Sequence, residues 1–140
     1  DQTRVRVSAA PLISAACHCT GCQRMSASAF SLTLAIPMGG FAVTKGKPVI
    51  GGLHGSTHHY FCSYCMSWMF TRPKDMNDFV NLRPSMLDDH NWVVPFIEVW
   101  TQEKLPWANT PAVHSYATQP EFAEYAKLIE EFARNGSCPA

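Results

Sequence analysis

The sequence predicts a mainly β, zinc-binding domain that ends in one amphipathic α-helix. Segments in which apolar and polar residues alternate recur as far as residue 100, and this period of two is typical of strands with one buried face. Five of the six cysteines fall in two tight clusters, a grouping that indicates a metal or redox site rather than dispersed disulfides. Helical spacing of apolar residues begins only after residue 118.

The composition excludes several classes of protein. A chain of 140 residues has the length of one ordinary domain. Lys+Arg and Asp+Glu number 11 each, so the positive field that nucleic-acid binding requires is missing. Charged residues make up 16% against about 25% in an average domain, which is compatible with a homodimer or a large ligand covering part of the surface. No apolar run reaches the roughly 20 residues of a membrane helix. The first residues hold no signal-peptide core, so we expect a soluble, cytoplasmic protein unless a leader has been removed.

Two strands are expected before the first cysteine cluster. Residues 3–8 alternate polar and apolar side chains with β-branched members, and Pro11 interrupts this pattern. Residues 12–16 form a second short strand that leads directly to Cys17. The first cluster therefore begins where a strand ends.

The geometry of the first cluster follows from this placement. In an extended chain Cys17 and Cys19 share one face, while His18 points to the other and is a poor ligand for the same ion. Gly21 is expected to adopt a positive φ and reverse the chain, which would bring Cys22 to the ion.

The middle of the chain is expected to be mostly strand. The predicted strands are residues 30–36, 41–44, 57–62, 67–72, 79–82 and 96–100. Turns are expected at Gly39-Gly40 and at residues 45–48, and a helical turn or loop over residues 23–29. Residues 85–89 form a turn or short helix. The strands on either side of Cys62 and Cys65 meet at a zinc knuckle.

The C-terminal segment is expected to be helical. Residues 118–121 fit a capping box, and apolar residues then recur at helical spacing until Asn135-Gly136: Phe122, Tyr125, Ile129 and Phe132. This aromatic stripe belongs to the core or to a dimer contact. We expect a zinc-binding domain over residues 1–118 and a helix over residues 119–136 that packs on that domain or on a partner.

The spacing of the cysteines allows three interpretations of their chemistry. Cys17, Cys19 and Cys22 supply the three ligands of a reactive zinc with one open position. Alternatively, Cys19 and Cys22 join Cys62 and Cys65 in one closed structural site, with Cys17 left over. A redox dithiol would need a thioredoxin-like βαβ context, which is absent. Spacing alone leaves the first two interpretations open.

Six motifs occur in an order that makes the pattern specific. They are Cys17-His18-Cys19-Thr20-Gly21-Cys22-Gln23-Arg24, Ser28-Ala29-Phe30, Gly46-Lys47-Pro48, Phe61-Cys62-Ser63-Tyr64-Cys65, Leu87-Asp88-Asp89 and Pro106-Trp107. Together they resemble the glutathione-dependent formaldehyde-activating enzyme and centromere protein V family. The resemblance runs from about residue 3 to residue 107 and leaves the C-terminal helix outside.

The resemblance implies a β-tent fold with two zinc ions. It assigns Cys17, Cys19 and Cys22 to the reactive ion. It assigns Cys62 and Cys65 to a structural ion whose other two ligands come from an upstream C-x-C pair. That pair is missing here, which indicates that the sequence is trimmed at its N-terminus. The family pattern also usually has glycine where this chain has Met66.

The resemblance implies a carbon–sulfur lyase. Its reaction would join a thiol, glutathione, to a small aldehyde, formaldehyde, as S-hydroxymethylglutathione. The alternative is a non-enzymatic zinc module for protein association, and the two differ in whether a zinc position is open. Fold alone does not decide between them.

For several other polar residues both a functional and a structural role are compatible with the sequence. Arg24 either neutralises the zinc-thiolate site or a substrate carboxylate, or is a surface charge. His54 lies in a glycine-rich loop from which it could approach the substrate. The adjacent His58 and His59 face opposite sides of a strand, one inward and one solvated. Asp88-Asp89 offer a general base or a local cap, and Cys138 near the chain end has no assigned role.

Overall fold

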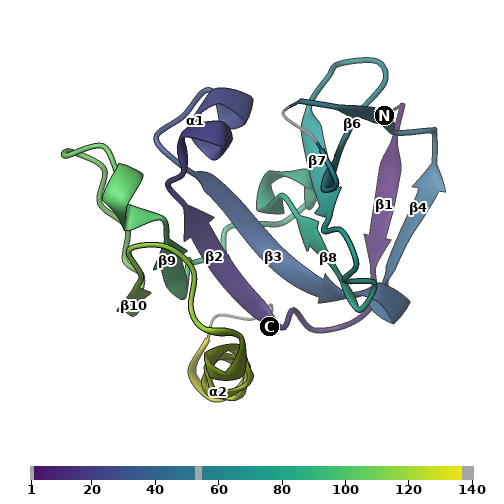
Figure 1. Ribbon diagram of the computed structural model, residues 1–140. Coiled ribbons are helices and arrows are strands. Elements are labelled where there is room, and N and C mark those ends of the chain that lie inside the picture. The colour runs from purple at the N-terminus through teal and green to yellow at the C-terminus, as the bar shows by residue number, and fades with distance from the viewer. Residues whose placement is uncertain (1, 53–54, 137–140) are drawn as a thin grey trace.

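The mainly β prediction and the C-terminal helix are confirmed by a computed structural model, which describes residues 2–52 and 55–136 (Figure 1). Within these residues the strands are β1 Arg4–Val7, β2 Ile13–Cys17, β3 Ser31–Pro37, β4 Phe41–Lys45, β5 Val49–Gly51, β6 His58–Phe61, β7 Trp68–Arg72, β8 Phe79–Leu82, β9 Ile97–Val99 and β10 His114–Ser115. The helices are α1 Thr20–Ser26 and α2 Phe122–Asn135, with 3-10 turns at Met38–Gly40, Pro84–Met86 and Thr101–Glu103.

The strands form one large and one small sheet. The large sheet has the order β10-β9-β2-β3-β8-β7-β6-β5, and β1 pairs with β4 in the small one. Strand β2 is paired on both sides: it runs antiparallel to β3 and parallel to β9, so Cys17 lies opposite both Ser31 and Val99. Strands β5 and β10 were not predicted because three and two residues are too few to show alternation.

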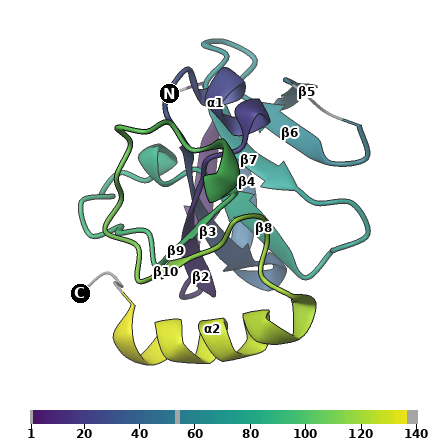
Figure 2. The ribbon, with the colours of Figure 1, turned by 60° about the vertical axis from the view of Figure 1, so that its left-hand side comes forward.

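Two apolar clusters hold the sheets and α2 together. The first joins β3, β7 and β8 and includes Leu34, Phe70 and Leu82. The second lies between β2, β9 and α2, where Phe132 meets Phe96 edge to face with ring centroids 5.5 Å apart. Helix α2 therefore lies along the base of the sheet, at the opposite end of β2 from α1 (Figure 2). Neither helix within the described residues has the length and apolarity to cross a membrane.

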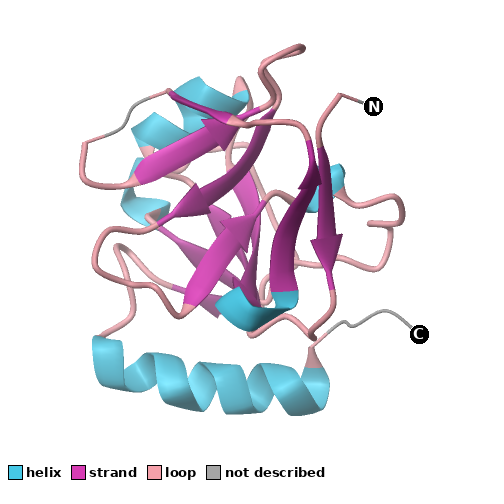
Figure 3. Ribbon diagram, turned by 90° about the vertical axis from the view of Figure 1, so that its right-hand side faces the viewer, coloured by secondary structure: helices cyan, strands magenta, loops and turns pink. Residues whose placement is uncertain are grey.

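The predicted capping box of α2 is wrong. The helix begins at Phe122 with Glu121 as its N-cap, which makes no side-chain capping bond. The backbone of Thr118 is instead used in a tertiary hydrogen bond, because its carbonyl accepts from Trp100 N at 2.9 Å. Phe122 is also not part of the buried stripe, since its side chain is 83% exposed. Leu128 carries the inward face beside Phe132, and α2 closes the base of the strands (Figure 3).

The turn between β6 and β7 contains an unusual backbone conformation. Met66 has φ 57°, the left-handed region that favours glycine. Its N–H donates to Cys62 O at 2.9 Å, and Cys62 N donates to Ser67 O at 3.0 Å, which closes the predicted knuckle. The left-handed φ gives a physical reason for the glycine that the resemblance leads us to expect at this position.

Replacing Met66 with glycine should raise the free energy of unfolding by about 1 kcal/mol, because a left-handed backbone costs a non-glycine residue about 1–2 kcal/mol and added chain entropy offsets part of this. Urea denaturation measures the change. Met76→Gly is the matched control, since Met76 is also exposed but has no positive φ. The same effect at both positions would contradict the explanation.

Candidate metal centre

Three cysteines that are separated along the chain converge at the end of β2. Cys17 is the last residue of β2, Cys19 is the N-cap of α1, and Cys22 lies in the first turn of α1. Their sulfur atoms all lie within 4.8 Å of one another, and each residue is half-buried. Within residues 2–52 and 55–136, no other three His, Cys, Asp or Glu side chains gather in this way.

A helical turn, not a glycine reversal, brings Cys22 to the other two. Gly21 lies inside α1 and is not among the residues with positive φ, so the predicted turn at Gly21 is wrong. Cys19 has an extended backbone, and its Sγ accepts a hydrogen bond from Cys22 N at 3.3 Å. A cysteine thus takes the capping role that Ser, Thr, Asp or Asn usually fill.

This donor set fits zinc. Three sulfurs bound to one tetrahedral zinc at about 2.3 Å would lie roughly 3.8 Å apart, within the observed limit of 4.8 Å. Cys62 and Cys65 do not join the group, so the closed site built from Cys19, Cys22, Cys62 and Cys65 is wrong. The group could hold a metal ion with three protein ligands, the number that leaves a position for another ligand.

The three thiols have different affinities for protons. A hydrogen bond from Cys17 is the main reason that the pKa of Cys22 is lowered to about 6; Ser31, Cys19 and the charge of Arg83 act in the same direction, and burial opposes them. The same contact with Cys22, together with burial, raises the pKa of Cys17, and burial raises the pKa of Cys19. A cation that binds all three sulfurs must therefore displace protons.

Arg83 is a buried cation beside this group that no sequence pattern marks. It follows β8, and only 8% of its surface is exposed. Its guanidinium lies over the Trp68 ring at 4.0 Å, a cation–π contact. Burial lowers the pKa of Arg83 to about 10, while the charges of Cys22 and Cys17 oppose the shift, so Arg83 is protonated at neutral pH.

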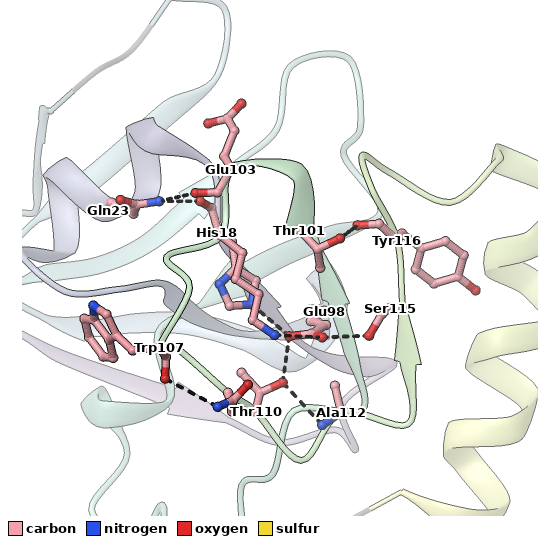
Figure 4. A network of polar contacts seen from close by, with 12 residues as sticks. His18, Gln23, Glu98, Thr101, Glu103, Trp107, Thr110, Ala112, Ser115 and Tyr116 are labelled. Atoms are coloured by element: carbon pink, nitrogen blue, oxygen red, sulfur yellow. Dashed lines mark hydrogen bonds and ion pairs between the residues drawn. The ribbon is translucent and has the colours of Figure 1, made fainter.

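The residue between the first two cysteines is locked to a buried carboxylate (Figure 4). His18 has no exposed surface, and its Nε2 donates to Glu98 Oε2 at 2.8 Å. Glu98 also accepts from Thr110 Oγ1 at 2.9 Å and Ser115 Oγ at 2.6 Å, and lies 3.6 Å from Lys104 Nζ. The prediction that His18 is turned away from the ligand face agrees with this placement.

A second set of contacts fixes α1 to the turn after β9. Gln23 Nε2 donates to the carbonyl oxygens of His18 at 2.7 Å and Glu103 at 3.0 Å. The Glu103 carboxylate accepts from both the backbone N–H and the hydroxyl of Thr20. The helix that carries Cys22 is therefore held at both its first and its second turn.

The exposed residue Arg24 lies between two surface cavities on either side of α1. The larger, about 600 Å³, is also lined by Leu105 and by Trp107, whose side chain is 71% exposed. The smaller, about 310 Å³, is lined by Phe61 and Met66 among others. Neither cavity is lined by the three clustered cysteines, so both open along α1 and not over the sulfurs.

Comparison with known proteins identifies the family. The sequence model of the glutathione-dependent formaldehyde-activating enzyme matches residues 1–103. The chain belongs to this family. Membership supports a formaldehyde-activating function and agrees with a cysteine-based metal site. Helix α2 lies outside the matched part.

Comparison of structures supports the fold. A crystal structure of a Rhodobacter sphaeroides protein aligns with a TM-score of 0.51 and 15% sequence identity, covering 62% of this chain and 81% of that one. At this identity the likeness shows a shared fold and nothing about substrate. No curated protein matches the chain.

The second cysteine pair is separate from the group of Cys17, Cys19 and Cys22. Cys62 is buried and Cys65 is exposed. The hydroxyl of Thr3 lies 3.4 Å from Cys62 Sγ and is the main cause that lowers the pKa of Cys62 to about 7, followed by the N–H groups of Cys65 and Tyr64. The start of the described chain therefore lies beside this pair.

The remaining predicted residues lie elsewhere. His54 and Cys138 fall outside the described residues. His58 is exposed, whereas the ring of His59 packs against Trp68 at 5.2 Å, which agrees with one solvated and one inward histidine. The acidic pair of the family motif has surface roles: Asp88 pairs with Arg4 at 3.5 Å, and Asp89 accepts from Asn91 N at 3.2 Å.

Replacing Glu98 with glutamine should lower the free energy of unfolding by about 2–3 kcal/mol at pH 7. Burial raises the pKa of Glu98. The hydrogen bonds from Ser115, His18 and Thr110 and the charge of Lys104 outweigh burial and lower this pKa to about 2. A depressed folded-state pKa stabilises the protein above the unfolded value of 4.5, and this stability is lost as the pH falls toward about 2.

Urea denaturation at a series of pH values, with chelator in every sample, measures this difference. The deficit of the Glu98→Gln variant should shrink between pH 4.5 and pH 2. Glu130→Gln, at an exposed position of α2, is the matched control and should show little deficit at any pH. A Glu98→Gln deficit that is independent of pH would contradict the charged role of Glu98.

Proposed function

We propose that the chain is a zinc-dependent carbon–sulfur lyase that joins glutathione to formaldehyde as S-hydroxymethylglutathione. The observation that carries the proposal is the group of three sulfurs within 4.8 Å, with no fourth protein ligand among the described residues, in a chain of the formaldehyde-activating family. A structural site would be closed by four ligands. Three ligands leave a place for the substrate's own sulfur.

Cys17, Cys19 and Cys22 would hold the zinc. When bound, zinc would keep a substrate thiol ionised and act as a Lewis acid. His18 supports this arrangement because its Nε2 is bonded to Glu98 and neither of its ring nitrogens lies within the sulfur group. Helix α1 is held by Gln23 and Thr20, so Cys22 keeps its place when substrate arrives.

The proposed reaction is an addition with no leaving group. The glutathione sulfur forms a bond to the aldehyde carbon, and the carbonyl π electrons move to oxygen. The proton released by the thiol ends on that oxygen, so no oxidant, reductant or further reactant is required. The product is a hemithioacetal.

Positioning has to supply most of the rate enhancement. A free thiol is already a few per cent ionised at neutral pH, so complete ionisation gains on the order of tenfold or somewhat more. A less basic sulfur is also a weaker nucleophile. Holding thiol and aldehyde in reacting geometry can contribute far more, with effective molarities of about 10⁵ M and above.

Arg24 is our candidate for positioning glutathione. It is exposed in the last turn of α1 and lines a cavity of about 600 Å³ together with the exposed indole of Trp107. Glutathione carries two carboxylates, and a guanidinium binds a carboxylate through two parallel hydrogen bonds. The cavity opens along the helix that carries Cys22, which suits the non-reacting part of the substrate.

We further propose that Cys62 and Cys65 hold a second, structural zinc if ligands precede the sequence shown. Two thiolates alone are two ligands short of a closed site. The contact between Thr3 and Cys62 supports the proposal, because it brings the start of the described chain to this pair.

The proposed reaction predicts that the zinc-loaded chain accelerates formation of S-hydroxymethylglutathione from glutathione and formaldehyde. Exchange NMR spectroscopy measures the rate against the uncatalysed background. Cys17→Ser should lose at least about 90% of the acceleration, because the site falls to two thiolates. Met76→Gly, far from the cysteines in sequence and not a lining residue of either cavity, should retain it.

The same assay separates the lyase from the alternative association module. A rate no faster than background would contradict the lyase and favour the module. Arg24→Gln should raise KM for glutathione by roughly tenfold, with little change for 2-mercaptoethanol, which has no carboxylate. An equal change for both thiols would remove Arg24 from substrate binding.

A further inference from the structure

Arg83 is a buried positive charge that has fewer partners than its five donors can use. Its exposed surface is 8%, and within the described part of the chain it has no carboxylate partner. One terminal nitrogen donates to Asn81 O at 3.4 Å, a long bond, and the buried Nε has no partner among the described residues. A buried charge is costly unless another charge compensates it, so its neighbours decide its role.

Sheet register places Arg83 on the face of the sulfurs. Cys17 lies opposite Ser31, and Leu34 lies opposite Leu82. Successive residues of a strand point to opposite faces, so Ser31 and Leu34 of β3 point to opposite faces of the sheet. Leu82 shares the face of Leu34. Arg83, the next residue, therefore points to the other face, which is the face of Ser31 and Cys17. The mutual electrostatic effects between Arg83 and Cys22 agree with this placement.

Trp68 closes the other side of the guanidinium. The distance from Arg83 to the indole ring is 4.0 Å. The indole N–H donates to Thr71 Oγ1 at 3.2 Å, and Thr71 is also 2.9 Å from His59 Nδ1. The platform behind Arg83 is therefore fixed, and the guanidinium cannot swing away from the sulfurs without losing it.

We propose that Arg83 makes the metal centre select an anionic fourth ligand, such as a thiolate, over a neutral one. The inference rests on the proposed metal site but not on the proposed reaction. Three thiolates and one divalent ion carry a net charge of −1, and an anionic fourth ligand makes this −2. Arg83 returns the total to −1, so its charge stabilises the complex with an anion more than the complex with a neutral ligand.

Arg83 could act on the centre by packing against Trp68 or by its positive charge. An activity assay would not distinguish these two roles. Loss of packing against Trp68 would weaken every ligand by a similar factor. Loss of the charge would weaken anions alone. Azide and imidazole, two nitrogen donors of different charge, separate these outcomes.

The test uses the full chain loaded with one equivalent of Co²⁺, whose visible spectrum reports ligand binding. Azide and imidazole are titrated into wild type, Arg83→Met, Arg83→Gln and Arg83→Lys. We expect both neutral variants to bind azide at least about tenfold more weakly and imidazole within about twofold of wild type. Arg83→Lys should lie between. Arg72→Gln removes an exposed arginine over Tyr60 and should leave both affinities unchanged.

Equal weakening of both ligands, or no change in either, would overturn the inference. If the neutral variants do not fold, the Arg83→Lys variant decides. Its displaced charge should still lower the affinity for azide relative to the affinity for imidazole. An unchanged ratio of the two affinities would overturn the inference. A wild-type chain that takes up no Co²⁺ would overturn both this inference and the metal site. An intact azide preference without lyase activity would overturn the proposed reaction alone.

Discussion

The buried contact between His18 and Glu98 is the constraint on which the metal centre depends. Glu98 lies on β9, which runs parallel to β2, and the backbone N–H of His18 also donates to Val99 O at 3.0 Å. Ring and backbone of one residue are thus fixed to one neighbouring strand. The cysteines on either side of His18 are left pointing away from Glu98, on the side where α1 delivers Cys22.

This arrangement separates two buried charges. The carboxylate of Glu98 is balanced by Lys104 and satisfied by three hydrogen-bond donors. Among the described residues Arg83 has no carboxylate partner, and the charges that act on it are those of Cys22 and Cys17. The carboxylate of Glu98 thus holds the segment around His18 in place, and the guanidinium of Arg83 acts on Cys22 and Cys17. A metal centre of net negative charge can sit in a largely apolar sheet because each buried charge has its own compensation.

Much of the fold could be predicted because its signals are local. Alternation identified the longer strands, and C-x-C-x-x-C spacing identified three sulfurs whose grouping the structure confirms. The predictions that were wrong concern positions where tertiary contacts override the local preference of the sequence. Thr118 carries a capping signal, but its carbonyl is bonded to Trp100, and Gly21 could reverse the chain but lies in a helix. Met66 occupies a left-handed position that the local sequence does not reveal.

The charged residues of the centre were harder to predict for the same reason. Arg24 is next to the cysteines in sequence, yet it is exposed beside surface cavities. Arg83 is about sixty residues away and comes to the face of the sheet that carries Cys17 only through the pairing of β8 with β3. Glu98 likewise comes to His18 only through the parallel pairing of β9 with β2. No single sequence pattern marks either residue, because strand order is a property of the whole chain.

We propose that Cys17, Cys19 and Cys22 hold one metal ion as thiolates and leave room for a substrate sulfur. X-ray absorption at the zinc edge counts the sulfur ligands directly, in a chain with Cys62→Ser and Cys65→Ser so that only the centre at Cys17 is loaded. We predict three sulfurs at about 2.3 Å and one lighter ligand, and four sulfurs after glutathione is added. Four sulfurs before glutathione, or a fourth ligand that glutathione does not displace, would contradict a three-thiolate centre with an open position.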